Sequence, residues 1–249
     1  MDIKNIPEHE LARLREKAKE LSGSTTDYQS EYSSLLTRRV NHEPLQYIEE
    51  YVPFYSISLK VDERCLIPRP ETEYLVQIIK DNIESPKKVL DVGTGSGCIA
   101  LMMKSIFPNS EVTGIDISED AIELANENSK LNSLEVSFFQ SNLLENVKET
   151  DHDLIVANLP YIPTENLNEL DREVIDYEPL TALNGGKDGL EIISNLIHEL
   201  EERDYKELNL FLEIDSRKSS ETLELLNSWD EVKLLEDLAE KDRYVFAKR

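Results

Sequence analysis

The chain has 249 residues, of which 39% are hydrophobic and 31% are charged, and this composition fits a globular protein rather than a disordered chain. The formal net charge of −24 opposes broad binding to nucleic-acid phosphates. No stretch approaches the roughly 20 apolar residues of a membrane span, and the charged N-terminal stretch over 1–20 does not resemble a signal peptide. Two cysteines and four scattered histidines support neither a disulfide framework nor a metal site. We therefore expect a cytoplasmic protein with no metal and no membrane contact.

The first third of the chain predicts two helices, a hairpin and a third helix. Apolar residues at helical spacing predict amphipathic helices over 7–22 and 27–41. The segment 45–62 alternates apolar and polar residues and is rich in Tyr, Val and Ile, which predicts a β-hairpin. Pro70 suits the first position of a helix that continues over 71–83.

From residue 87 onward, short apolar strands alternate with helices. We expect strands at 88–92, 112–116, 136–139, 153–157 and 209–214, helices at 97–106, 118–131, 188–203 and 217–228, and a final antiparallel pair of strands at 231–235 and 243–247. This alternation predicts an α/β fold with a doubly wound, mostly parallel, seven-stranded sheet. The predicted organisation is an N-terminal helical domain (1–44), a β-hairpin linker (45–66) and a main domain (67–249).

A glycine-rich motif lies between the first strand of the main domain and its helix. It consists of Asp91, Val92, Gly93, Thr94, Gly95, Ser96 and Gly97. Glycines there allow a tight turn and close approach to a ligand, and Asp116 at the end of the next strand can accept hydrogen bonds from two ribose hydroxyls. A dinucleotide fingerprint would need Gly or Ala at the position of Cys98. The spacing instead resembles the first motif of S-adenosylmethionine-dependent methyltransferases, where Asp91 would lie near the sulfonium and amino-acid part of the cofactor.

A polar tetrapeptide follows the fourth strand, at the edge where open parallel sheets bind ligands. Its residues are Asn158, Leu159, Pro160 and Tyr161. The side-chain oxygen of Asn158 and the carbonyl of Leu159 can accept hydrogen bonds from a planar, weakly nucleophilic nitrogen, and Pro160 biases Leu159 toward extended backbone. Tyr161 can pack against the flat group, so positioning would carry most of a methyl transfer. The tetrapeptide resembles the (N/D)PPY signature of methyltransferases that act on exocyclic or amide nitrogens.

Segments flanking both motifs resemble one family, the protein-(glutamine-N5) methyltransferases that modify peptide chain release factors. The matching stretches are 43–48, 54–55, 67–73, 158–163, 177–179, 182–183, 185–190, 212–214 and 237–243. The resemblance covers about residues 30–249, and the stretch Ile-Pro-Arg-Pro-Glu-Thr-Glu at 67–73 is its most specific part, because generic methyltransferases lack it. It implies a Rossmann-like class I methyltransferase fold preceded by a small helical domain and a hairpin.

The resemblance also implies an activity, a cofactor and a set of site residues. The activity is methylation of the glutamine side-chain amide in the Gly-Gly-Gln motif of class 1 release factors, with S-adenosyl-L-methionine as cofactor and S-adenosyl-L-homocysteine as product. Carried over by position, the cofactor-binding residues are Asp91, Gly93, Thr94, Gly95, Ser96, Gly97, Asp116, Asn142, Leu143 and Asn158, with Leu143 against the adenine. The residues from Asn158 to Tyr161 would hold the glutamine. Arg69 and Glu71 would lie at the pocket rim or, alternatively, form an inter-domain salt bridge.

The expected partner is a release factor gripped by the N-terminal helices, which look about 20 residues shorter than is usual in the family. We expect a monomer without stable nucleic-acid binding. Two other functions stay open. Asn-Leu-Pro-Tyr is also the form seen in ribosomal RNA adenine dimethyltransferases, which suggests an adenine-amine methyltransferase acting on RNA or DNA, although such an enzyme should show a basic stripe. Because Asn142, Leu159 and Asp215 depart from the family pattern, a catalytically weak binding module is the third possibility.

Overall fold

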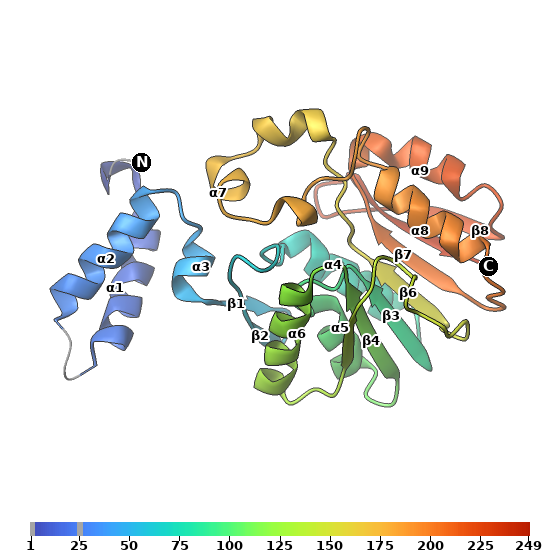
Figure 1. The fold of residues 1–249 in the computed structure, drawn as a ribbon, viewed down its shortest axis with the longest axis horizontal. Helices are drawn as coiled ribbons and strands as arrows, with labels where there is room; N and C mark the ends of the chain where they lie inside the picture. Colours follow the sequence, from blue (N-terminus) through green and yellow to red (C-terminus); the bar gives the residue numbers. More distant parts are fainter. Residues whose placement is uncertain (1–2, 24–26) are drawn as a thin grey trace.

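The computed structural model describes residues 3–23 and 27–249 of the chain. Helices at the N-terminus stand beside a two-stranded hairpin, which leads into a seven-stranded sheet with helices on both faces (Figure 1). Over the described ranges, none of the helices combines the length and the apolar character that crossing a membrane requires.

The N-terminal helices share a small core of their own. A 3-10 turn, η1 (Ile3–Asn5), precedes α1 (Glu8–Ser22), α2 (Tyr28–Val40) and α3 (Leu45–Glu49). Their shared buried residues are Leu14, Ala18, Leu35, Leu45 and Ile48. The expectation of a hairpin from residue 45 was therefore wrong for its first five residues. Leu45 and Ile48 lie three positions apart on one face of a helix, and burial of that face against α1 and α2 outweighs the local alternation.

The hairpin itself is shorter than expected and belongs to the core of the main sheet. It pairs β1 (Tyr51–Phe54) with β2 (Ile57–Lys60) in antiparallel register, with Val52 opposite Leu59. Val52, Phe54 and Leu59 are buried together with residues of the large sheet. The hairpin is thus fixed to the sheet, and it carries the chain from α3 to the segment that borders the site.

The large sheet confirms the predicted topology. Its strands are β3 (Lys88–Val92), β4 (Glu111–Asp116), β5 (Ser137–Gln140), β6 (Leu154–Ala157), β7 (Asn209–Glu213), β8 (Glu231–Glu236) and β9 (Asp242–Lys248). They lie in the order β5-β4-β3-β6-β7-β9-β8, with the first five parallel and β9 antiparallel to both of its neighbours. The expected antiparallel pair is present, but of its two strands β8 alone lies at an edge of the sheet, because β9 inserts between β7 and β8.

Helices cover both faces of this sheet (Figure 1). They are α4 (Pro70–Asn82) and α5 (Cys98–Ile106) on one face, α8 (Glu191–Glu201) and α9 (Ser219–Leu225) on the other, and α6 (Glu119–Asn132), which packs on β2, β4 and β5. Successive residues of each strand point to opposite faces, so Val89 joins the core under α5 while Leu90 joins the core under α8. Both faces are therefore buried, which explains the almost continuous apolar strands.

A long insertion between β6 and α8 had no predicted structure. It contains η2 (Thr164–Glu169), α7 (Arg172–Ile175) and η3 (Leu180–Ala182), and it runs from the sheet toward the N-terminal helices (Figure 1). The Arg39 guanidinium of α2 donates to Glu173 at 2.6 Å, and the Tyr177 hydroxyl donates to the carbonyl of Asn41 at 2.8 Å. These contacts join the insertion to the N-terminal helices.

Candidate active site

A hollow lies at the carboxyl edge of the sheet, where the strand order reverses between β3 and β6. Open α/β sheets bind ligands at such a switch point, because the loops that follow the two strands run in opposite directions and leave a crevice. The lining residues are Arg64, Cys65, Leu66, Pro68, Arg69, Thr72, Val92, Gly93, Thr94, Gly95, Ser96, Cys98, Ile99, Asp116, Ile117, Ser118, Ala121, Ser141, Asn142, Leu143, Asn158, Leu159, Pro160, Pro179, Thr181, Ala182, Ile192 and Asn195. Most predicted site residues thus border one cavity.

The glycine-rich loop forms the floor of the hollow. Gly93 has a φ of 74°, and a Cβ on it would lie 2.9 Å from Cδ2 of Leu159, so this position needs glycine both for its backbone and for the close approach of the tetrapeptide. The amides of Gly93 and Thr94 donate to the carbonyl of Ile115 at 2.9 and 2.8 Å. The loop is therefore held against β4 while its free edge faces the cavity.

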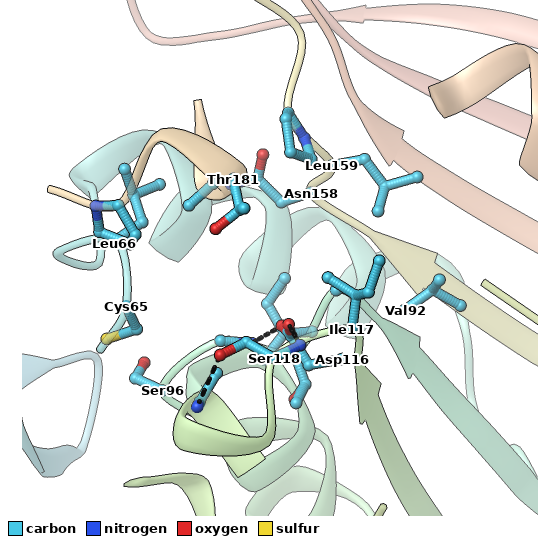
Figure 2. Close-up of a pocket in the computed structure, with 18 of the residues that line it drawn as sticks. Cys65, Leu66, Val92, Ser96, Asp116, Ile117, Ser118, Asn158, Leu159 and Thr181 are labelled. Atoms are coloured by element: carbon cyan, nitrogen blue, oxygen red, sulfur yellow. Dashed lines mark hydrogen bonds between the residues drawn. The ribbon is translucent and has the colours of Figure 1, made fainter. Parts of the chain in front are cut away.

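Asp116 stands at the end of β4, on the side of the hollow opposite Asn158 (Figure 2). One carboxylate oxygen accepts from the amide of Gly95 and the other from the amide of Ser118, each at 2.9 Å. Burial raises its pKa, and the backbone hydrogen bonds oppose that shift. Each oxygen keeps further lone pairs, so the carboxylate can accept two hydroxyl donors from a ligand.

Asp91 does not line the hollow, but it is hydrogen-bonded to Thr94, which does. Its Oδ2 accepts from the Thr94 hydroxyl at 2.6 Å and from the Ala100 amide at 3.0 Å. Among the described residues, Asp91 Oδ1 and Ser96 Oγ are buried without a hydrogen-bond partner. Burial raises the pKa of Asp91 to about 7. Buried polar atoms are normally satisfied. Ser96 lines the hollow, so its hydroxyl oxygen could accept a hydrogen bond from a ligand bound there.

Two apolar side chains, Ile117 and Leu143, also line the hollow. Leu143 follows β5 in a left-handed conformation with φ 45°, and the Ser141 hydroxyl donates to its carbonyl at 2.7 Å. Ile117, directly after Asp116, lines the hollow and leaves 57% of its surface exposed. An exposed large apolar side chain beside a polar cradle suits a flat aromatic ligand. Ile117 had no predicted role, although its position next to the predicted ribose acceptor was a usable signal.

Three residues of the tetrapeptide line the hollow, and the fourth packs in the core behind it. Asn158, Leu159 and Pro160 line the hollow, and Asn158 donates from Nδ2 to the Thr72 hydroxyl at 3.0 Å. Tyr161 lies outside the lining; its hydroxyl donates to Glu213 at 3.4 Å and its ring packs against the core.

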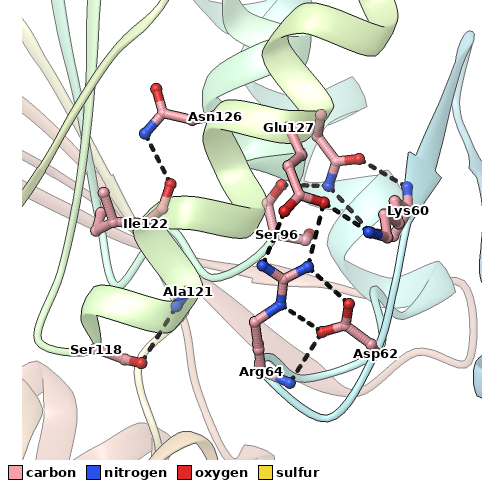
Figure 3. Close-up of polar contacts among 10 residues, drawn as sticks. Lys60, Asp62, Arg64, Ser96, Ser118, Ala121, Ile122, Asn126 and Glu127 are labelled. Atoms are coloured by element: carbon pink, nitrogen blue, oxygen red, sulfur yellow. Dashed lines mark hydrogen bonds and ion pairs between the residues drawn. The ribbon is translucent and has the colours of Figure 1, made fainter.

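The outer wall of the hollow is the segment that follows the hairpin. The Arg64 guanidinium lies between the carboxylates of Asp62, in the same segment, and Glu127, in α6, and donates hydrogen bonds to both (Figure 3). The hydrogen bonds that Glu127 accepts from Arg64 and from Lys60 lower its pKa to about 2. The Tyr47 hydroxyl donates to the carbonyl of Cys65 at 2.6 Å. The segment is thus anchored on α6 from one side and on α3 from the other.

Arg69 and Glu71 have different surroundings. Arg69 lines the hollow and pairs with Glu178 of the insertion, whose side chain is only 1% exposed and also accepts from the Ile67 amide at 3.1 Å. Burial raises the pKa of Glu178, and Arg69 opposes that shift. Glu71 lies outside the lining, and its carbonyl accepts from the Tyr244 hydroxyl at 2.8 Å. Arg69 therefore both borders the cavity and joins two segments that are 109 positions apart.

Three residues near the site received no role from the sequence: Thr72, Glu178 and Glu213. Each lies within a stretch that carried the family resemblance, which was the available signal. Asp215, one of the departures from the family pattern, caps the 3-10 turn η4 (Ser216–Lys218) by accepting from the Arg217 amide at 2.9 Å. Within the described part of the chain, no three His, Cys, Asp or Glu side chains gather as a metal site.

A glycine cradle after β3, an acid at the end of β4 and a polar tetrapeptide after β6 together define a methyltransferase of the doubly wound class. The family described as Methyltransferase small domain matches residues 70–176. The release factor glutamine methyltransferase of Thermodesulfovibrio yellowstonii is 36% identical, over 90% of this chain and 83% of that protein. The protein of the same name from Lactococcus lactis is 36% identical over 90% and 84%. The chain belongs to the release factor glutamine methyltransferase family.

Solved structures agree with the fold. A methyltransferase from Pyrococcus furiosus superimposes with a TM-score of 0.60 at 20% identity, covering 87% of this chain and 98% of that one. At that identity the likeness concerns the fold alone. It covers a larger share of the chain than the stretch 70–176 that matches the family description.

Proposed function

We propose that the chain transfers the methyl group of S-adenosyl-L-methionine to the side-chain amide nitrogen of the glutamine in the Gly-Gly-Gln motif of class 1 peptide chain release factors. The observation that carries the proposal is the identity of 36% to proteins named for this activity over more than four fifths of both chains. The hollow supports it, because Asn158 and the glycine-rich loop border the same cavity.

The residues present fit this cofactor. Asp116 would accept from the two ribose hydroxyls, and Ile117 and Leu143 would contact the adenine, with Asn142 beside them. The unpartnered oxygens of Asp91 and Ser96, with the glycine-rich loop, suit the amino-acid part, whose ammonium group would favour the ionised form of Asp91. When bound, the cofactor supplies an electrophilic methyl group on a sulfonium.

The contribution of the chain is to orient a poor nucleophile. The lone pair of an amide nitrogen is delocalised, so the substrate must be held with its nitrogen in line with the methyl group. The Asn158 oxygen and the Leu159 carbonyl would accept the two N–H bonds of the glutamine, and Pro160 fixes the direction of that carbonyl. Tyr161 supports this arrangement from the core side, through Glu213.

The N-terminal part would recognise the release factor. We infer a division into a recognition domain (1–44), a linker that contains the hairpin (45–66) and a catalytic domain (67–249). The insertion contacts both the recognition helices and the wall of the hollow, through Arg39 with Glu173 and Arg69 with Glu178. We further infer a monomer that acts in the cytoplasm without stable nucleic-acid binding, in keeping with the net charge of −24.

A methyl-transfer assay tests the proposal directly. Purified class 1 release factor and ribosomal RNA are offered separately with labelled S-adenosyl-L-methionine, and the product is mapped by mass spectrometry. We expect one methyl group on the Gly-Gly-Gln glutamine and none on RNA. A release factor variant with asparagine in place of that glutamine is the matched control and should stay unlabelled. Methyl groups on RNA adenine, or cofactor binding without transfer, would overturn the proposal.

A further inference from the structure

A network of hydrogen-bonded, buried polar side chains lies behind Asn158. The Nδ2 atom of Asn158 lies 3.0 Å from the hydroxyl of Thr72 in α4, and that hydroxyl lies 2.9 Å from Oε2 of Glu213 at the end of β7. The other oxygen of Glu213 accepts from Tyr161 at 3.4 Å. Thr72 and Glu213 are each 2% exposed. Helix α4 and strand β7 thus meet behind the residue that faces the substrate position.

The donor and acceptor groups of Asn158, Thr72 and Glu213 fix the direction of each hydrogen bond between them. A carboxylate can only accept hydrogen bonds, and Thr72 has a single hydroxyl proton, so that proton is directed to Glu213. The hydroxyl oxygen can then only accept from Asn158, which places the amide nitrogen of Asn158 toward Thr72. The side-chain oxygen of Asn158 makes no hydrogen bond within this network, so it can accept one from the substrate. An asparagine amide is nearly symmetric in shape, so without such a partner a half-turn would exchange its donor and acceptor.

Glu213 is costly to bury. Over the described residues it forms no ion pair within 4.0 Å, and its contacts in the network are two hydroxyl groups. An ionised carboxylate in an apolar core is unfavourable unless its environment or a function compensates for the cost. Orienting Asn158 is a function that requires an acceptor-only group at this place.

We propose that Glu213 and Thr72 are positioning residues, which through a directed hydrogen-bond relay hold the Asn158 amide with its oxygen toward the substrate nitrogen. The substrate in question is the glutamine amide of the proposed function, on which this proposal rests. Neither residue needs to touch the reacting atoms. Their effect is to raise the fraction of molecules in which Asn158 presents an acceptor rather than a donor.

The relay depends on the ionised form of Glu213. Burial raises the pKa of Glu213 to about 7, while the Thr72 hydrogen bond and nearby Arg243 oppose the shift. The other titratable groups near it are Glu71 of α4, Cys98 of α5, Tyr161 and Tyr244 of β9. Once protonated, Glu213 can donate to Thr72, and the hydroxyl proton becomes free to turn toward Asn158. The orienting effect should therefore weaken below about pH 7.

Steady-state kinetics at saturating cofactor test the relay. Thr72→Val removes the hydroxyl at almost constant shape, and Thr72→Ser keeps it. We expect kcat to fall at least tenfold in Thr72→Val and to return to within threefold of the unmodified protein in Thr72→Ser. The Kd of S-adenosyl-L-homocysteine should stay within twofold throughout. Thr222→Val is the matched control, because Thr222 of α9 is also buried but donates to the Lys218 carbonyl of η4. A Thr72→Val variant with unchanged kcat, or equal losses in both Thr72 variants, would overturn the proposal.

A second measurement does not depend on turnover. The side-chain ¹⁵N–¹H₂ resonance of Asn158, assigned by its loss in Asn158→Ala, is followed from pH 5.5 to 8.5. We expect it to shift with a midpoint near 7 in the unmodified protein and to lose that step in Thr72→Val. A chemical shift that does not change with pH in the unmodified protein, or a pH-dependent step that persists in Thr72→Val, would refute the relay. Absence of release factor methylation by the unmodified protein would overturn the proposed function alone, since the resonance still decides the relay.

Discussion

Replacing Asp116 by alanine should weaken cofactor binding without unfolding the chain. Each carboxylate oxygen is already bonded to one backbone amide, from Gly95 or Ser118, and would still accept from one ribose hydroxyl. A hydrogen bond to a charged group contributes about 1.5–3 kcal/mol. Loss of one such bond corresponds to a rise in Kd of about 10- to 150-fold, and loss of both corresponds to a rise of about 150-fold or more.

Isothermal calorimetry with S-adenosyl-L-homocysteine measures this effect, because the product is not turned over. The matched control is Asp120→Ala, which removes an exposed carboxylate from the first turn of α6, four residues further along. It lowers the negative charge equally and should leave Kd unchanged. Since Asp116→Ala also leaves two amides without their acceptor, thermal unfolding is recorded in parallel. A folded Asp116→Ala protein with a Kd within twofold of the unmodified chain would refute the assignment.

Three further predictions concern the other polar groups of the site. Asn158→Ala should abolish methyl transfer in the labelled assay while the Kd of the cofactor stays within about tenfold, or 1.4 kcal/mol; unchanged turnover would contradict its role. Arg69→Ala leaves the buried Glu178 unpaired and should lower the free energy of unfolding by about 3 kcal/mol in urea titrations, whereas a double variant that adds Glu178→Gln should recover part of that loss. Burial raises the pKa of Asp91 from 3.8 to about 7, so the folded chain holds a proton that the unfolded chain releases between these values. Its contribution to stability is present below about pH 4 and lost as the pH rises through 7; unfolding titrations from pH 4 to 7 should therefore show a flatter decline for Asp91→Asn, and identical slopes would contradict the shift.

Local patterns predicted most of the main domain because its strands are short, apolar and separated by helices of regular period. Pro70 begins α4 as expected, and the strands β3 to β7 fall within one or two residues of their predicted ranges. The site could be anticipated for a related reason. The carboxyl ends of parallel strands meet at one edge, so motifs that follow different strands come together there.

Other features depended on contacts between distant residues. Leu45 and Ile48 form a helix because α1 and α2 offer an apolar surface to cover, which the alternation of the segment could not reveal. The position of β9 between β7 and β8 follows from pairing on both of its edges. The insertion between β6 and α8 has little periodicity, and its course is held by side chains such as Glu178 that meet partners more than 100 positions away.

The fold class, the glycine-rich loop, the acid at the end of β4 and the tetrapeptide could all be recognised before folding, because each depends on consecutive residues or on a short hydrophobic period. The hydrogen-bond partners of these groups depend instead on contacts between segments that are distant in the chain. The tertiary structure separated Tyr161 from the hollow, paired Arg69 with Glu178 and set Thr72 and Glu213 behind Asn158. The direction of a hydrogen bond depends on which donor and acceptor are brought within about 3 Å, and residues 141 positions apart meet at that distance only after the chain has folded.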